Sequence, residues 1–152
     1  MSHHVPDHGD WIAVCDGATA LLLENRGDHG AIHLVTREIF KQDNPLTHEQ
    51  GTSPPGRTNS AHGGRRAAME GSDYHLQAEE AFLHKFAASL DAHVRSKQIP
   101  ALHLIAPPRA LGILRKQLSD ATREVVAGEL AHDYVKFPLE EIERRLLAPD
   151  RG

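Results

Sequence analysis

The stretch "WIAVCDGATALLLEN", residues 11–25, decides how this chain begins to fold. A short apolar run from Trp11 is closed by Asp16-Gly17, a dipeptide that favours a tight turn between antiparallel strands. The residues "TALLLEN" that follow are then the hairpin partner of that first strand. After a turn at residues 25–28, "AIHLVTREIF" at residues 31–40 shows a mixed two-residue alternation. We therefore expect three consecutive antiparallel strands at the start of the chain.

A long amphipathic helix is expected in the middle of the chain. Apolar residues recur every four positions from Ala78 through Phe82 and Phe86 to Leu90, which is the width of stripe that packs a helix on a sheet. Ser72 or Asp73 can cap its first turn, since either side chain accepts a hydrogen bond from a free backbone N–H. We expect this helix to end near residue 97.

Strands and helices then alternate. "ALHLIA" at residues 101–106 reads as a buried strand, and Pro108 can occupy the first turn of a helix. "REVVAGEL" at residues 123–130 reads as a last strand and "PLEEIERRLL" at residues 138–147 as a closing helix. Strands separated by helices imply parallel crossovers. The order predicts an α/β fold: a ribonuclease H-like five-stranded mixed sheet, strand order 3-2-1-4-5, with helices packed on it.

This order brings two distant residues to one edge of the sheet. The strand that begins at Trp11 and the strand that begins at Ala101 are expected to be parallel neighbours, so both end at the same edge. Asp16 and Arg109 follow these two ends, and we expect them to form an ion pair within about 4 Å. Ligands of open α/β sheets bind in the crevice at this edge.

Residues 43–70 lack any periodicity and are rich in Pro, Gly, Ser, Thr and Asn, which predicts a long mobile loop. Between residues 44 and 68 three arginines, Arg57, Arg65 and Arg66, stand against the single acid Glu49, whereas the whole chain has a net charge of -4. Loops of this length inside a small domain are binding elements or disordered linkers. Both interpretations remain open here.

Composition restricts the number of domains and the class of protein to which the chain can belong. With 152 residues, 39% apolar and 25% charged, the chain is long enough for one domain, expected over residues 11–148 after a flexible N-terminus of residues 1–10. Its net charge of -4 lacks the basic excess of a dedicated nucleic-acid binder. No apolar run approaches the roughly 20 residues of a membrane span, and no signal pattern is visible, so we expect no membrane partner and a cytoplasmic location. Cys15 is the only cysteine, and an inert buried thiol is favoured.

Few residues suggest catalysis. Asp16 and Glu79 can converge as in a nuclease, but the strand at residues 101–106 ends in prolines where another acid is needed. The pairs His75 with Glu79 and Glu80 with His84 are one helical turn apart, so they are either metal ligands or surface ion pairs, and the second interpretation is favoured. No nucleophile motif or cofactor fingerprint is present. We expect no catalytic residue, no metal and no cofactor.

Two stretches carry a resemblance to a known family. "APPRALGILRKQLS" at residues 106–119, together with "WIAVCDGATALLLE" at residues 11–24, resembles the bacterial host attachment family. The resemblance runs over residues 11–147. The matched features are Asp16-Gly17, Gly56-Arg57, Gly63-Gly64-Arg65, and Ala106-Pro107-Pro108-Arg109 followed by Leu111-Gly112 and Leu114-Arg115.

That family is similar to the middle domain of archaeal and eukaryotic class-1 peptide-chain release factors. In those factors a Gly-Gly-Gln tip, just before a long helix, promotes peptidyl-tRNA hydrolysis on the ribosome. Gly63-Gly64 has the corresponding place here, but Arg65 stands where the glutamine is expected. The resemblance implies RNA contact without hydrolysis.

Two functions follow from these observations. The first is a noncatalytic module associated with the ribosome or structured RNA. Its expected ligand-binding residues are Arg57, Gly63, Gly64, Arg65, Arg66, Arg109 and Asp16. The alternative is a protein-interaction adaptor that influences host-cell attachment indirectly.

Overall fold

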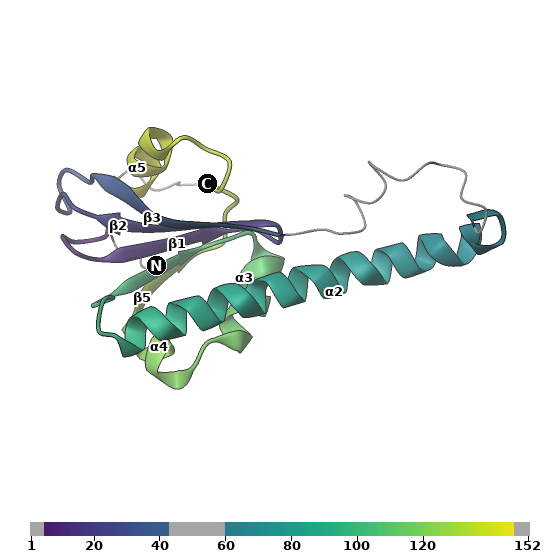
Figure 1. Cartoon of the computed structure of the whole chain (residues 1–152). Coiled ribbons are helices and arrows are strands. Elements are labelled where there is room, and N and C mark those ends of the chain that lie inside the picture. Colours follow the sequence, from purple (N-terminus) through teal and green to yellow (C-terminus); the bar gives the residue numbers. More distant parts are fainter. Residues whose placement is uncertain (1–4, 43–59, 148–152) are drawn as a thin grey trace.

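The computed structural model of the chain describes residues 5–42 and 60–147, with side chains over 5–42 and 74–147 (Figure 1). One five-stranded mixed sheet runs through it in the order β3-β2-β1-β4-β5. The strands are β1 (Trp11–Cys15), β2 (Thr19–Asn25), β3 (Leu34–Lys41), β4 (Leu102–Ile105) and β5 (Val126–Leu130). The predicted fold class and strand order are confirmed.

The first hairpin forms where Asp16-Gly17 predicted it. β1 and β2 pair antiparallel, with Cys15 opposite Ala20. The Asp16 carboxylate closes the turn, because its Oδ1 accepts hydrogen bonds from the N–H groups of Ala18 and Thr19, both at 2.8 Å. An aspartate that binds its own following amides is a standard turn former. β1 pairs in parallel with β4 on its other side.

The sheet separates two apolar cores. Alternate residues of β1 point to opposite faces, so Trp11 and Ala13 belong to one core and Ile12 and Val14 to the other. The first core is covered by α2 (Ser60–Arg95), α3 (Pro108–Gln117) and α4 (Asp120–Val125). The second is covered by α5 (Leu139–Leu147) on the opposite face (Figure 1).

Helix α2 packs on the sheet through the predicted stripe. Phe82, Phe86 and Leu90 are buried in the first core, and the helix ends at Arg95, close to the predicted end. The predicted start at Ser72 or Asp73 is wrong, because the helix already begins at Ser60.

The reason for the earlier start is the absence of any helix breaker. No proline occurs between residues 56 and 99, and the three glycines of this part of the helix, at positions 63, 64 and 71, cost only about 1 kcal/mol each. The part of the expected loop from Ser60 onward is therefore helical. Residues 43–59 of that loop lie outside the described residues.

A short helix, α4, precedes β5 where the sequence predicted a strand from residue 123. Ser119 caps it, because the Ser119 hydroxyl accepts a hydrogen bond from the N–H of Thr122. Asp91 on α2 in turn accepts hydrogen bonds from the N–H and hydroxyl of Ser119 at 3.2 and 3.0 Å. Local sequence patterns do not predict a helix cap that depends on a carboxylate far away in the sequence.

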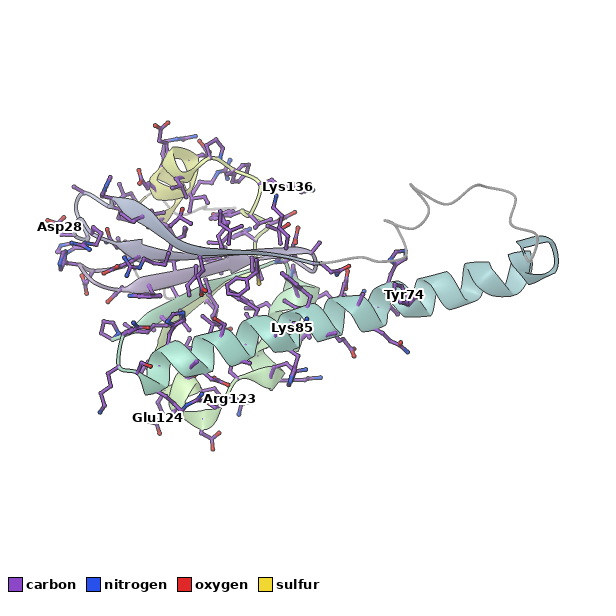
Figure 2. The ribbon with its side chains drawn as sticks, viewed as in Figure 1. Asp28, Tyr74, Lys85, Arg123, Glu124 and Lys136 are labelled. Atoms are coloured by element: carbon purple, nitrogen blue, oxygen red, sulfur yellow. The ribbon has the colours of Figure 1, made fainter. Side chains whose placement is uncertain are left out.

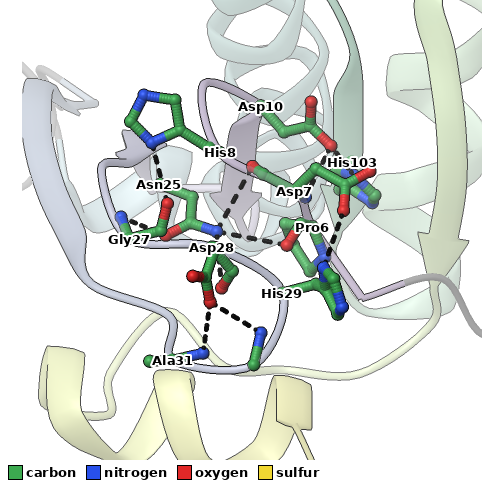
Figure 3. A network of polar contacts seen from close by, with 11 residues as sticks. Pro6, Asp7, His8, Asp10, Asn25, Gly27, Asp28, His29, Ala31 and His103 are labelled. Carbon is green, nitrogen blue, oxygen red and sulfur yellow. Dashed lines mark hydrogen bonds and ion pairs between the residues drawn. The ribbon is translucent and has the colours of Figure 1, made fainter.

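Residues 5–10 lie in the segment that was expected to be a flexible N-terminus, and here they are tied to the sheet (Figure 3). The fully buried Asn25 side chain donates from Nδ2 to the carbonyl oxygens of Pro6 and Asp7 at 3.1 and 3.3 Å. The N–H of Gly9 donates to the Asn25 carbonyl at 2.8 Å. Residues 1–4 lie outside the described residues.

Candidate functional site

A cleft lies at the sheet edge where β1 and β4 end. Its volume is about 460 Å³. The lining comes from four places in the chain: the β1–β2 turn, the end of β3, α2, and the start of α3. These residues are Asp16, Gly17, Ala18, Gln42, His75, Glu79, Pro107, Arg109 and Ala110. The crevice predicted from the strand order is therefore present, and Asp16 and Arg109 both line it.

Arg109 forms its ion pair with α2 rather than with the β1–β2 turn. Its Nη2 is 3.4 Å from Oε1 of Glu79, with 56% of the arginine side chain and 37% of the glutamate side chain exposed. The predicted Asp16–Arg109 pair is wrong. The short Asp16 carboxylate is directed back at the amides of its own turn, whereas Glu79 reaches Arg109 from the facing helix.

Gly17 allows α2 to approach the turn closely. A Cβ placed on Gly17 would lie 2.7 Å from both Cγ and Cδ of Glu79, which is closer than real side-chain carbons pack. Gln42, just after β3, holds the same turn from the other side: its Nε2 donates to the Gly17 carbonyl at 2.9 Å. Turn, strand end and helix thus meet at Gly17.

Pro107 and Pro108 place Arg109 at the mouth of the cleft. Pro108 is the first residue of α3, where its missing N–H costs no helical hydrogen bond. The helix starts immediately after β4, so Arg109 lies in its first turn at the sheet edge. Arg115, near the other end of α3, pairs with Glu129 at 2.6 Å instead and takes no part in the cleft.

The remaining predicted residues lie away from this cleft. Helix α2 continues beyond the sheet edge (Figure 1), and we call residues 60–73 the α2 arm. Gly63, Gly64, Arg65 and Arg66 belong to the α2 arm. A rise of about 1.5 Å per residue places Gly64 about 22 Å along the helix axis from Glu79. Arg57 lies outside the described residues.

The comparison with known families now bears on this arrangement. The family model described as "Protein required for attachment to host cells" matches residues 11–146. The chain belongs to this host attachment family. The match extends from the first residue of β1 into the last turn of α5, so it includes both the cleft and the α2 arm. No curated protein matches the chain.

In this host attachment family member, the described side chains around the cleft include neither a cluster of metal ligands nor a reactive thiol. Over residues 5–42 and 74–147, no three His, Cys, Asp or Glu side chains are grouped as metal ligands. Burial raises the pKa of the neighbouring Cys15 thiol to about 12, and the Asp16 charge adds to the effect. That thiol is therefore protonated at neutral pH and is a poor nucleophile. Neither expected histidine pair forms: Glu79 pairs with Arg109, and His84 contacts Gln117.

Two functional features were missed from the sequence. Gln42 carried no pattern that marked it, because its role depends on where β3 ends against the β1–β2 turn. The partnership of Glu79 with Arg109 had a weak signal, since Glu79 was already expected to approach Asp16.

Within the described part of the host attachment chain, no helix is both long and apolar enough to cross a bilayer.

Proposed function

We propose that this chain is a noncatalytic RNA- or ribosome-associated module in which the α2 arm presents Arg65 and Arg66 to phosphate groups. The observation that carries the proposal is the continuation of α2 beyond the sheet edge (Figure 1). With 36 residues, α2 is about 54 Å long, and only its later turns belong to the core. A helix that leaves its domain in this way carries its residues toward a partner.

Three arginines, Arg57, Arg65 and Arg66, favour an anionic partner for the segment of residues 57–66. The chain has a net charge of -4, so its surface as a whole does not attract nucleic acid. The arginines of residues 57–66 are an exception, and guanidinium groups bind phosphate through paired N–H donors. RNA contact is therefore assigned to the α2 arm and to Arg57, and not to the whole surface.

Similarity of the family to the middle domain of class-1 release factors adds support. In that domain the Gly-Gly-Gln tip reaches the ribosomal active centre. Here Gly63-Gly64 lies within helix α2 rather than in a loop before it, and Arg65 stands in place of the glutamine, so the similarity is limited to the position near the start of the long helix. The proposal therefore includes contact with RNA and excludes release chemistry.

The cleft has a supporting role in this proposal. Glu79 and Arg109 connect α2 to α3 where the α2 arm begins, and Gly17 lets the helix lie close to the turn. They add to the packing of Phe82 and Phe86, which holds α2 on the sheet. Because Glu79 balances its charge, Arg109 contributes less to phosphate binding than Arg65 and Arg66, and Asp16 acts only through the turn.

The test is cosedimentation of the full chain with purified ribosomes, and binding to structured RNA, over a range of salt concentrations. Replacing Arg57, Arg65 and Arg66 with Ala is expected to weaken binding and to reduce the slope of log affinity against log salt by about 3. The matched control replaces Arg26, Lys116 and Lys136, three exposed cations of the body without an ion pair among the described residues. It removes the same charge and is expected to change binding little.

Two results would contradict the proposal. One is equal loss of binding in the arm variant and in the control, which would show attraction by net charge only. The other is absence of binding by every protein, including the unmodified chain. The alternative, a protein-interaction adaptor that influences host-cell attachment indirectly, would then be the better account.

A further inference from the structure

A second cavity lies between α2 and the end of β3, and Gln42 lines both this cavity and the cleft. Its volume is about 430 Å³, within the range of about 300–1,000 Å³ of small-molecule sites. It is lined by Phe40, Lys41, Gln42, Tyr74, Gln77, Ala78, Ala81, Phe82 and Lys85. We call it the lysine-rimmed groove, and Figure 2 shows Tyr74 and Lys85 along α2.

The groove exists because small side chains of α2 lie next to large ones. Phe82 and Phe86 fill the space between helix and sheet, and Phe40 is fixed against Phe86 with ring centroids 5.2 Å apart. One turn further toward the α2 arm the helix presents Ala78 and Ala81, which end at Cβ. Phe40 and Phe82 therefore form the aromatic surface of the groove, and the space next to the two alanines is not filled by a side chain.

The charged side chains among the described residues that line the groove have one sign. Lys41 and Lys85 are exposed and line it, and none of the lining residues is an aspartate or glutamate. Neither lysine forms an ion pair within the part of the chain that the structure describes. In a chain with a net charge of -4, this is a local cationic site beside an apolar surface.

We propose that the lysine-rimmed groove binds a small amphiphilic carboxylate, an alkyl or aryl acid whose apolar part lies on Phe40 and Phe82. The carboxylate would accept charge-assisted hydrogen bonds from the lysine ammonium groups. The side-chain amide of Gln77 supplies a further donor, while that of Gln42 already donates to the Gly17 carbonyl at 2.9 Å. This inference is independent of RNA association, since it uses neither Arg65 nor Arg66.

The same charges argue against a second copy of the chain as the occupant. A symmetric contact through this groove would place Lys41 and Lys85 of one copy near the same lysines of the other, and like charges repel. A single small acid fits both the volume and the sign of charge. The occupant is therefore assigned to this one chemical class.

The probe is octanoate, titrated into the full chain and followed by ¹H–¹⁵N NMR, with 1-octanol as the neutral comparison. Saturable shifts are expected at the amides of Phe40, Gln42 and Ala81. Ala81→Leu fills the groove and is expected to weaken octanoate binding about tenfold or more. Its matched control, Ala88→Leu, changes another exposed alanine of α2 outside the lining and is expected to bind like the unmodified chain.

A second pair of variants tests the charge. Lys41→Gln combined with Lys85→Gln is expected to weaken octanoate about tenfold and to leave octanol binding unchanged. Lys116→Gln combined with Lys136→Gln is the control for net charge. Thermal melting checks that every variant folds, which is expected because Ala81 and both lysines are exposed.

Three results would overturn the proposal. The first is the absence of saturable shifts with octanoate. The second is equal binding by Ala81→Leu and the unmodified chain, which would place the ligand elsewhere. The third is a loss in Ala81→Leu with no loss in the double lysine variant, because the groove would then be apolar only and the carboxylate class would be wrong.

Discussion

Glu79 of α2 and Arg109 of α3 form an ion pair across the mouth of the cleft, with Nη2 and Oε1 3.4 Å apart. The pair lies above Gly17, whose missing side chain makes room for Glu79. It connects the helix that leaves the sheet to the helix that follows β4. The pair thus joins residues far apart in the sequence, whereas the packing of Phe82, Phe86 and Leu90 on the sheet sets the direction of α2.

The strength of this pair can be measured by a double-mutant cycle. Because both side chains are more than a third exposed, the coupling between Glu79→Gln and Arg109→Gln is expected to be about 0.2–1 kcal/mol. It should fall in about 1 M salt, where the screening length is only about 3 Å. Urea unfolding of the four proteins gives the value. A coupling that is larger and unaffected by salt would contradict the exposed geometry.

Gly17→Ala is expected to displace the Glu79 side chain and weaken its ion pair with Arg109, because the added Cβ would lie 2.7 Å from Cγ and Cδ of Glu79. Since Glu79 is a flexible and partly exposed side chain that can move away, the cost in stability is expected to be no more than about 1 kcal/mol. The cost should largely disappear in the background of Glu79→Ala, since the three atoms nearest to the added Cβ all belong to that side chain. Gly112→Ala is the control: nothing lies within 4 Å of its added Cβ, and alanine is the better helix former. Chemical unfolding of these variants measures the effect, and an equal penalty in both backgrounds would place the strain elsewhere.

Phe86→Ala is expected to cost about 3–5 kcal/mol of the free energy of unfolding, because the ring is fully buried between α2 and the sheet. Leu76 lies on the same helix but is 40% exposed, so Leu76→Ala should cost far less. Thermal or urea unfolding compares the two. A melting temperature unchanged by Phe86→Ala would disprove the assignment of this stripe to the core.

Stability should depend on Asp28 below neutral pH. Backbone N–H groups of Gly30 and Ala31 donate to its carboxylate and lower its pKa below the ordinary value. A carboxylate with a lowered folded-state pKa stabilises the fold above its unfolded pKa of about 4, and this contribution is lost as the pH falls through the folded value. Asp28→Asn should therefore flatten the decline in urea midpoint on acidification from pH about 5. An identical decline in both proteins would contradict the assignment.

Cys15 should resist alkylation in the folded chain. Burial raises the pKa of its thiol to about 12, so almost no reactive thiolate exists at pH about 8. Mass spectrometry after iodoacetamide treatment should show no modification under native conditions and complete modification in urea. Rapid native labelling would show that β1 opens locally.

Local patterns were sufficient to predict most of the architecture. The Asp16-Gly17 turn, the apolar stripe that ends at Leu90, and Pro108 at the start of α3 each act through neighbouring residues, so each can be read without a structure. Their order then restricts the sheet to few topologies, because parallel crossovers are right-handed and sequential strands tend to pair. The strand order β3-β2-β1-β4-β5 followed from these rules.

Tertiary structure decided which of these side chains meet. The sequence places Asp16 and Arg109 at one sheet edge, but side-chain length and competing backbone amides determine that Glu79, rather than Asp16, pairs with Arg109. The start of α2 at Ser60 was also beyond local prediction, since glycine weakens a helix without terminating it. The first turn and the positions of most strands could be predicted from the sequence because their patterns are local. Helix α4, the cleft, its ion pair and the lysine-rimmed groove depend on contacts between segments that only the folded chain brings together.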